Sequence, residues 1–210
     1  MAAIISAVCL PRVAIFTDEK ARLLREATPE VVNRAWRTSG LVPAIHYLSD
    51  LENPELPHYD LYVAYAPVTL TAAQAQVLRR RTDDAGKMLV VVGATALASR
   101  DFAGAEDALA VLRPGKGKFL RFEREGDLTP EALNAWARQA GIVPFAEPGN
   151  ATYVGNGVAC VHRLKGPARI DFGRTVIPVD PVTGKKGAPL RFWTPSLDVG
   201  RSAAIGYLLE

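Results

Sequence analysis

The sequence predicts an α/β protein built in two parts: a parallel sheet with helices on both faces, followed by a small antiparallel β domain. Strand and helix patterns alternate over the first part of the chain, whereas short β-rich runs follow one another from about Ile142 with no helical pattern between them. We therefore expect an N-terminal extension over residues 1–11, an α/β domain over 12–145 and a β domain over 146–210.

The expected elements of the α/β domain appear in order along the chain. Apolar, β-rich runs predict strands at residues 12–17, 43–48, 60–65, 87–92 and 118–123. An acidic, proline-punctuated loop at 49–59 separates the second strand from the third. Cap residues and glycine stops predict helices over 28–40, 71–86, 101–112 and 129–141. Within the second of these helices, Thr71 and Gln74 have the spacing of a capping box.

The β domain is predicted from six short runs separated by turn signals. The runs are ATYVGN, VACVHRL, ARIDF, TVIPV, LRFWTP and AAIGYLL. Asn156-Gly157 between two of them is typical of a tight hairpin, and Asp180 to Gly184 forms another turn.

Composition excludes several classes of function. The 25 basic and 22 acidic residues leave a net charge of +3, which is too small to indicate a nucleic-acid partner. The basic run Arg79 to Arg81 suits a solvated helix end. The apolar start MAAIISAVCLP lacks a basic region and is broken by Pro11, so we expect no membrane partner and no clear signal peptide, with a cytoplasmic or unknown location. Cys9 and Cys160 are expected to be free thiols.

The carboxyl edge of the parallel sheet is where ligands and catalytic groups gather in such folds. The run KMLVVVGATALAS enters that edge at Gly93, where a hydrolase or amidotransferase carries a nucleophilic Ser or Cys. This turn offers only small residues, of which Thr95 alone has a hydroxyl.

Acidic residues at the same edge give an alternative without a protein nucleophile. Asp18 and Asp50 follow two of the strands, with Glu52 and Glu55 close by, and such oxygen ligands suit Ca²⁺ or Mg²⁺. A bound cation there could activate water for the hydrolysis of esters or lactones. The competing interpretation is that these side chains cap loops. Asp18, Asp50, His58 and Thr95 are therefore catalytic candidates, and Asp18, Asp50 and Glu52 metal candidates.

The histidines and aromatic residues offer two further hypotheses. His58, in the acidic loop, could join a Ser-His-Asp set with Ser49 or Ser99, whereas His46 and His162 lie in β patterns that favour structural roles. Trp193 and Tyr153, with Phe192, could form a sugar-stacking face. Alternation places Phe192 and Trp193 on opposite faces of their strand, so one of the two is expected in the core.

Five stretches of the sequence carry a resemblance to a known family: HYLSDLENPELPHYDLYVAYAPVTLTAAQAQVLRRR, KMLVVVGA, ATYVGNGVACVHRLKGPARIDF, VDPVTGKK and the terminal YLLE. They resemble the C-terminal region of β-galactosidase-like glycoside hydrolases. The resemblance covers roughly residues 12–210. It implies a flavodoxin-like or class I glutamine-amidotransferase-like domain followed by a small β domain, without the catalytic barrel and its pair of carboxylates.

The resemblance therefore implies a non-catalytic assembly or accessory module. The expected partners of such a module are a second copy of the chain or a glycoside hydrolase chain. The resemblance also implies that the chain is a stand-alone or truncated accessory region. Whether the chain is an enzyme stays open. The alternatives are the cation-assisted ester or lactone hydrolase, with Ca²⁺ or Mg²⁺ as its cofactor, and a carbohydrate-binding module.

Overall fold

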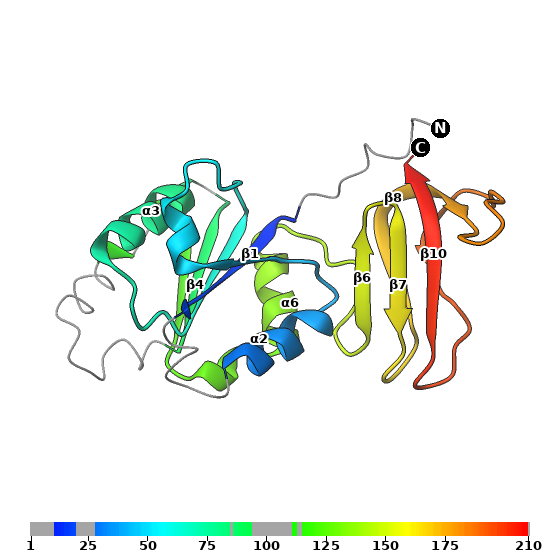
Figure 1. Ribbon diagram of the computed structural model, residues 1–210, viewed down its shortest axis with the longest axis horizontal. Coiled ribbons are helices and arrows are strands. Elements are labelled where there is room, and N and C mark those ends of the chain that lie inside the picture. Colours follow the sequence, from blue (N-terminus) through cyan, green and yellow to red (C-terminus); the bar gives the residue numbers. More distant parts are fainter. Residues whose placement is uncertain (1–10, 20–27, 85, 94–110, 113–114, 210) are drawn as a thin grey trace.

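The computed structural model describes residues 11–19, 28–84, 86–93, 111–112 and 115–209, and it contains two sheets that lie next to each other (Figure 1). The first is a five-stranded sheet in which every pairing is parallel, and the second is five-stranded and antiparallel. The prediction of an α/β fold followed by a β domain is confirmed at this level.

The parallel sheet has the strand order β2-β1-β3-β4-β5. Its strands are β1 (Val13–Thr17), β2 (Ala44–Tyr47), β3 (Leu61–Tyr65), β4 (Met88–Val92) and β5 (Lys118–Phe122). Every residue of β3 and β4 is buried. Strands buried on both faces read as continuous apolar runs, which is why LYVAY and MLVVV show no alternation.

Helices cover both faces of this sheet, as predicted. The helices α2 (Thr28–Arg37) and α6 (Pro130–Gln139) share one apolar cluster with the sheet, and η1 (Leu48–Glu52) and α3 (Ala72–Thr82) share the other. The expected capping box is present, since Thr71 Oγ1 accepts from the Gln74 amide and the Gln74 side chain accepts from the Thr71 amide. The helix expected at 101–112 lies outside the described residues except for its last two positions.

Two short 3₁₀ helices were not anticipated. The expected acidic loop begins instead with η1, and η2 (Glu125–Asp127) follows β5. Each has an aspartate at its third position that accepts a hydrogen bond from the backbone amide before the helix, Asp50 from Tyr47 at 2.9 Å and Asp127 from Arg124 at 3.2 Å. Local side-chain bonds of this kind favour a turn over extended chain.

The antiparallel sheet has the strand order β6-β7-β10-β8-β9. Its strands are β6 (Ala151–Gly155), β7 (Val158–His162), β8 (Ile170–Val179), β9 (Leu190–Trp193) and β10 (Ser202–Leu209). The β6–β7 hairpin turns at Asn156 and Gly157, whose φ angles of 51° and 75° are those a two-residue turn requires. The expected runs ARIDF and TVIPV form one long strand, because the chain continues through Gly173 at φ 71° with only a shift in register.

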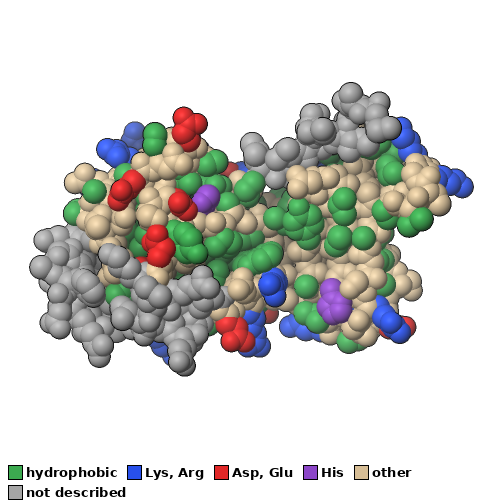
Figure 2. All heavy atoms as spheres, viewed as in Figure 1, with side chains coloured by type: hydrophobic (Ala, Val, Ile, Leu, Met, Phe, Trp, Pro, Cys, Tyr) green, Lys and Arg blue, Asp and Glu red, His purple; other side chains and the backbone are tan. Residues whose placement is uncertain are grey.

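The segment between the sheets is hydrogen-bonded to the end of α2. Gly40 O accepts from Phe145 N at 2.8 Å, and Thr38 O accepts from Gly149 N at 2.8 Å. Buried Asn134 on α6 donates to the carbonyls of Ser39 and Ala146. We call each sheet with the elements packed on it a module, and the segment between the sheets the junction. Figure 2 shows hydrophobic side chains of both modules on either side of this junction. The two sheets are thus joined by specific backbone contacts and not by a loose linker.

Among the described residues, no helix is long and apolar enough to cross a membrane.

Candidate functional site

Asp18 lies where the strand order changes direction, at the carboxyl end of β1. The chain leaves β1 for β2 on one side and returns to β3 on the other, and ligands of open α/β sheets bind at such a point. Asp18 is only 2% exposed, and its two carboxylate oxygens accept from Thr69 N at 2.5 Å and Thr69 Oγ1 at 3.0 Å. Asp18 therefore holds the loop after β3 against the end of β1.

Asp50 and His46 form a separate chain of contacts at β2. Asp50 Oδ2 is 3.7 Å from His46 Nδ1, and His46 Nε2 is 2.7 Å from the hydroxyl oxygen of buried Tyr59. Burial lowers the pKa of His46 more than the Asp50 carboxylate raises it, and burial raises the pKa of Tyr59. A neutral His46 beside a protonated phenol is a stable structural pair, in line with the structural role predicted for His46.

The remaining predicted residues at this edge are dispersed. Glu52 accepts from the Gln74 side chain at 3.1 Å, and His58 is exposed. Ser49 Oγ donates to Glu19, while Thr95 and Ser99 lie outside the described residues. In the part of the chain that is described, no three His, Cys, Asp or Glu side chains form a group that could hold a metal ion. Asp18, Asp50 and Glu52 each accept hydrogen bonds from a different protein group. Their proposed catalytic and metal-binding roles stay predictions.

The aromatic candidates lie far apart in the antiparallel sheet. Tyr153 is on β6 and Trp193 on β9, which are the two edge strands. Trp193 packs against the core of the β module, whereas Phe192 is 43% exposed, as the alternation in the sequence indicates. Phe192 makes a cation–π contact, because the Arg169 guanidinium carbon lies 4.1 Å from the ring centroid.

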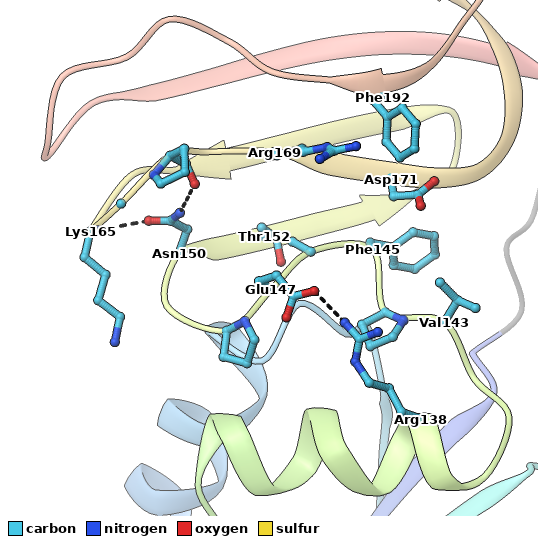
Figure 3. Close-up of a pocket in the computed structure, with 15 residues that line it drawn as sticks. Arg138, Val143, Phe145, Glu147, Asn150, Thr152, Lys165, Arg169, Asp171 and Phe192 are labelled. Carbon is cyan, nitrogen blue, oxygen red and sulfur yellow. Dashed lines mark hydrogen bonds and ion pairs between the residues drawn. The ribbon is translucent and has the colours of Figure 1, made fainter.

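A cavity of about 750 Å³ opens between α6, the segment that joins the sheets, and the antiparallel sheet (Figure 3). This volume is in the range of small-molecule sites. Its walls combine charged, polar and apolar side chains: Arg138, Val143, Pro144, Phe145, Ala146, Glu147, Pro148, Asn150, Thr152, Lys165, Gly166, Pro167, Arg169, Asp171 and Phe192.

Asn150 fixes one wall of this cavity. Its Oδ1 accepts from the amides of Leu164 and Lys165 at 2.8 and 3.0 Å, and its Nδ2 donates to Pro167 O at 3.1 Å. The opposite wall is tied to the same segment, because Asp171 N donates to Phe145 O at 2.7 Å. Buried Asn150 thereby gives the 164–167 turn a defined position above the space.

Sequence reasoning missed this cavity. Its residues come from α6, the joining segment, and the ends of several β-rich runs, so no local motif marks it. Two signals were available: Gly149-Asn150 directly before a strand, and the alternation that places Arg169 and Asp171 on the same side of a β run.

Comparison with known proteins shows that the chain shares its fold with solved structures. No family model matches the chain, and no curated protein matches it. It is similar to a solved structure of a catalytic mutant of Gan42B, a GH42 β-galactosidase from G. stearothermophilus, with a TM-score of 0.61 and 10% identity. A second structure of Gan42B gives a TM-score of 0.57 and 12% identity.

The likeness extends over nearly the whole chain and over less than half of the neighbour. It covers 94% of this chain and 40% of the mutant Gan42B chain, and 93% and 40% for the second structure. At 10% and 12% identity, it shows a shared fold that includes both sheet modules.

Proposed function

We propose that this chain is a glycoside-hydrolase-related accessory module, which assembles with itself or with a glycoside hydrolase chain and does not catalyse a reaction. The observation that carries the proposal is the extent of the likeness to Gan42B. It spans 94% of this chain, including both sheets, but only 40% of the hydrolase chain. A two-sheet unit of this kind thus exists as one region of a larger hydrolase.

The chemistry at the carboxyl edge supports a non-catalytic role. Each carboxylate there accepts hydrogen bonds from the protein itself: Asp18 from Thr69, Asp50 from the Tyr47 amide and Glu52 from the Gln74 side chain. Carboxylates that serve as caps and loop ties are a structural use of acidic residues. The competing hydrolase hypothesis requires the same oxygens to face a cation.

We further infer the fold family of the α/β domain. An all-parallel sheet in the order β2-β1-β3-β4-β5 with helices on both faces supports a flavodoxin-like or class I amidotransferase-like domain. The sequence after Gly93, where an amidotransferase carries its nucleophile, reads Ala94-Thr95-Ala96-Leu97 and contains neither Ser nor Cys at these positions.

The edge strand β2 is the surface we propose for assembly. One side of this strand is unpaired in the described sheet, and Ile45 and Tyr47 are 45% and 43% exposed on the same face of the strand. An unpaired strand edge with exposed apolar side chains is a site where a second chain can pair.

Sedimentation velocity over a range of protein concentrations tests self-association. We expect a concentration-dependent oligomer that Ile45→Ser weakens, whereas Val182→Ser, which removes a side chain that is 91% exposed in a distant turn, leaves it unchanged. A monomer at every concentration, together with no binding to a purified GH42 β-galactosidase chain, would contradict the proposal.

An activity assay separates this proposal from the hydrolase hypothesis. We expect no turnover of a generic activated ester or lactone, with or without added Ca²⁺ or Mg²⁺. Turnover that is abolished by EDTA and by Asp50→Asn would replace the accessory role by a cation-assisted hydrolase. Asp50 suits this purpose because its side chain is exposed and the substitution threatens the fold less than one at buried Asp18.

A further inference from the structure

A buried hydroxyl without a partner marks the cavity between the modules. Thr152 on β6 is only 6% exposed, and among the described residues its Oγ1 is the buried side-chain polar atom with no hydrogen-bond partner. Figure 3 shows this hydroxyl directed into the space between the sheet and α6. Burial of an unpaired hydroxyl costs free energy unless something hydrogen-bonds to it, so the position points to a ligand.

The acidic groups of the cavity are already paired. Arg138 Nη2 is 2.6 Å from Glu147 Oε1, and Arg191 binds Asp171 through two contacts of 3.0 and 3.2 Å. The hydrogen bond from Arg191 lowers the pKa of Asp171 more than burial raises it, so Asp171 carries its charge at neutral pH. The negative charge of the walls is therefore balanced by these two arginines.

Two further cations of the walls form no direct ion pair within the described residues, although one of them, Arg169, lies close enough to Asp171 for its charge to help lower the pKa of that carboxyl. They are Lys165 and Arg169. The Arg169 guanidinium carbon lies 4.1 Å from the centroid of the Phe192 ring, and the Lys165 side chain lies against Gly149, where an added Cβ would come within 2.5 Å of Lys165 Cε. Both side chains thus pack against other residues of the cavity walls while they stay exposed to solvent.

Taken together, these features indicate the chemistry of the occupant. We propose that the cavity binds a small organic oxyanion, a carboxylate or phosphate ester on a body of mono- or disaccharide size. The oxyanion meets Arg169 or Lys165, a polar atom of the body pairs with Thr152, and the carbon skeleton lies against Val143 and Phe145. This inference is independent of the assembly role proposed above.

Titration calorimetry of the full chain with four probes tests the proposal. The probes are glucuronate, glucose 6-phosphate, neutral glucose and inorganic phosphate at low salt. We expect heat of binding with at least one of the two anionic sugars, and the one that binds identifies the anionic group. Glucose and inorganic phosphate should bind at least about tenfold more weakly, because each lacks one part of the recognised chemistry. Binding should weaken as salt is added.

Three variants place the binding in this cavity. Thr152→Val, Lys165→Gln and Arg169→Gln should each raise Kd by about tenfold, whereas Thr175→Val, Lys186→Gln and Arg174→Gln, at exposed positions outside the cavity, should not. Thr152→Val should also leave the melting temperature of the free protein unchanged or higher, because it removes an unpaired hydroxyl.

Any of three results would overturn the inference. They are the absence of binding by both anionic sugars, binding that none of the three cavity variants weakens, and a lower melting temperature for ligand-free Thr152→Val. The last would mean that the hydroxyl already has a partner inside the protein. Lys165→Gln keeps the test decisive if another variant fails to fold, because Lys165 is exposed.

Discussion

Asp18 has a structural role because its carboxylate accepts hydrogen bonds from within the protein. Both of its oxygens bind Thr69, one to the backbone amide and one to the hydroxyl, in a setting nearly closed to water. Hydrogen bonds to a buried charged group contribute about 1.5–3 kcal/mol, and an amide left without an acceptor costs a similar amount. These two hydrogen bonds therefore tie the loop after β3 to the end of β1.

Asp18→Asn should lower the free energy of unfolding by about 1.5–3 kcal/mol, because an amide group cannot accept on both sides. Urea denaturation followed by far-UV circular dichroism measures the change. Asp50→Asn serves as the control, since its side chain is 45% exposed and is expected to cost less. An Asp18→Asn protein as stable as the parent would reopen Asp18 as a residue kept for ligand binding.

Residue-scale prediction from sequence succeeded where both partners are close along the chain. The Thr71–Gln74 capping box has a three-residue spacing, and the Asn156-Gly157 turn is itself a dipeptide. It could not find the partner of Asp18, because Thr69 is 51 positions away and becomes a neighbour only when β1 and β3 pair. Nor could it foresee that Thr152 has a hydroxyl without a partner.

At the scale of elements, a shared carboxylate joins three strands at the amino edge of the parallel sheet. Asp60, just before β3, binds Arg12 before β1 at 2.6 Å and Lys87 before β4 at 2.7 Å. Burial acts to raise the pKa of Asp60, but the hydrogen bonds from Lys87 and Arg12 outweigh it and lower that pKa below its ordinary value of 3.8. The charged form is thus favoured by folding.

This pair of contacts should make the fold sensitive to acid. Because the pKa is lower in the folded state, the stabilisation is present above about pH 4 and is lost as the pH falls through the folded value. Asp60→Asn should therefore be less stable than the parent at pH 7, and the difference should shrink toward pH 3. Urea midpoints at several pH values measure it, with Glu55→Gln as an exposed control. A difference that does not change with pH would contradict this account.

Element prediction worked best where burial sets the pattern. The strands β3 and β4 lie within the predicted apolar runs to a residue or so, because a strand buried on both faces leaves an unmistakable apolar block. It was less successful where pairing with a neighbour decides, as in β8, where two expected runs continue through Gly173 as one strand. The 3₁₀ helix η1 depends on Asp50 reaching back to the Tyr47 amide, which an acidic loop composition does not reveal.

At the scale of the whole molecule, the position of one sheet relative to the other creates the cavity. Arg138 belongs to α6 of the first module, whereas Thr152 and Arg169 belong to the second. The fold class follows from patterns along the chain, but a cavity between modules follows from tertiary packing. The backbone contacts between the end of α2 and residues 145–149 fix that packing, so they also fix the geometry of the proposed site.

Gly40 is the position at which this coupling can be broken. Its φ is +77°, and a Cβ there would lie 1.8 Å from the carbonyl oxygen of Ala146, so Gly40→Ala must both strain the backbone and push the joining segment away. Gly141→Ala is a matched control, since Gly141 has φ +73° and no atom within 4 Å of the added carbon. The control should lose about 1–2 kcal/mol of stability from backbone strain alone, and Gly40→Ala should lose more.

Differential scanning calorimetry distinguishes the two effects. The parent and Gly141→Ala should each unfold in one transition, because both modules share the contacts around residues 145–149. Gly40→Ala should unfold in two, as the modules lose that connection, and its affinity for an anionic sugar should fall with it. A single transition in Gly40→Ala, lowered no further than in Gly141→Ala, would mean that the joining segment adapts freely and that the cavity is not a preformed site.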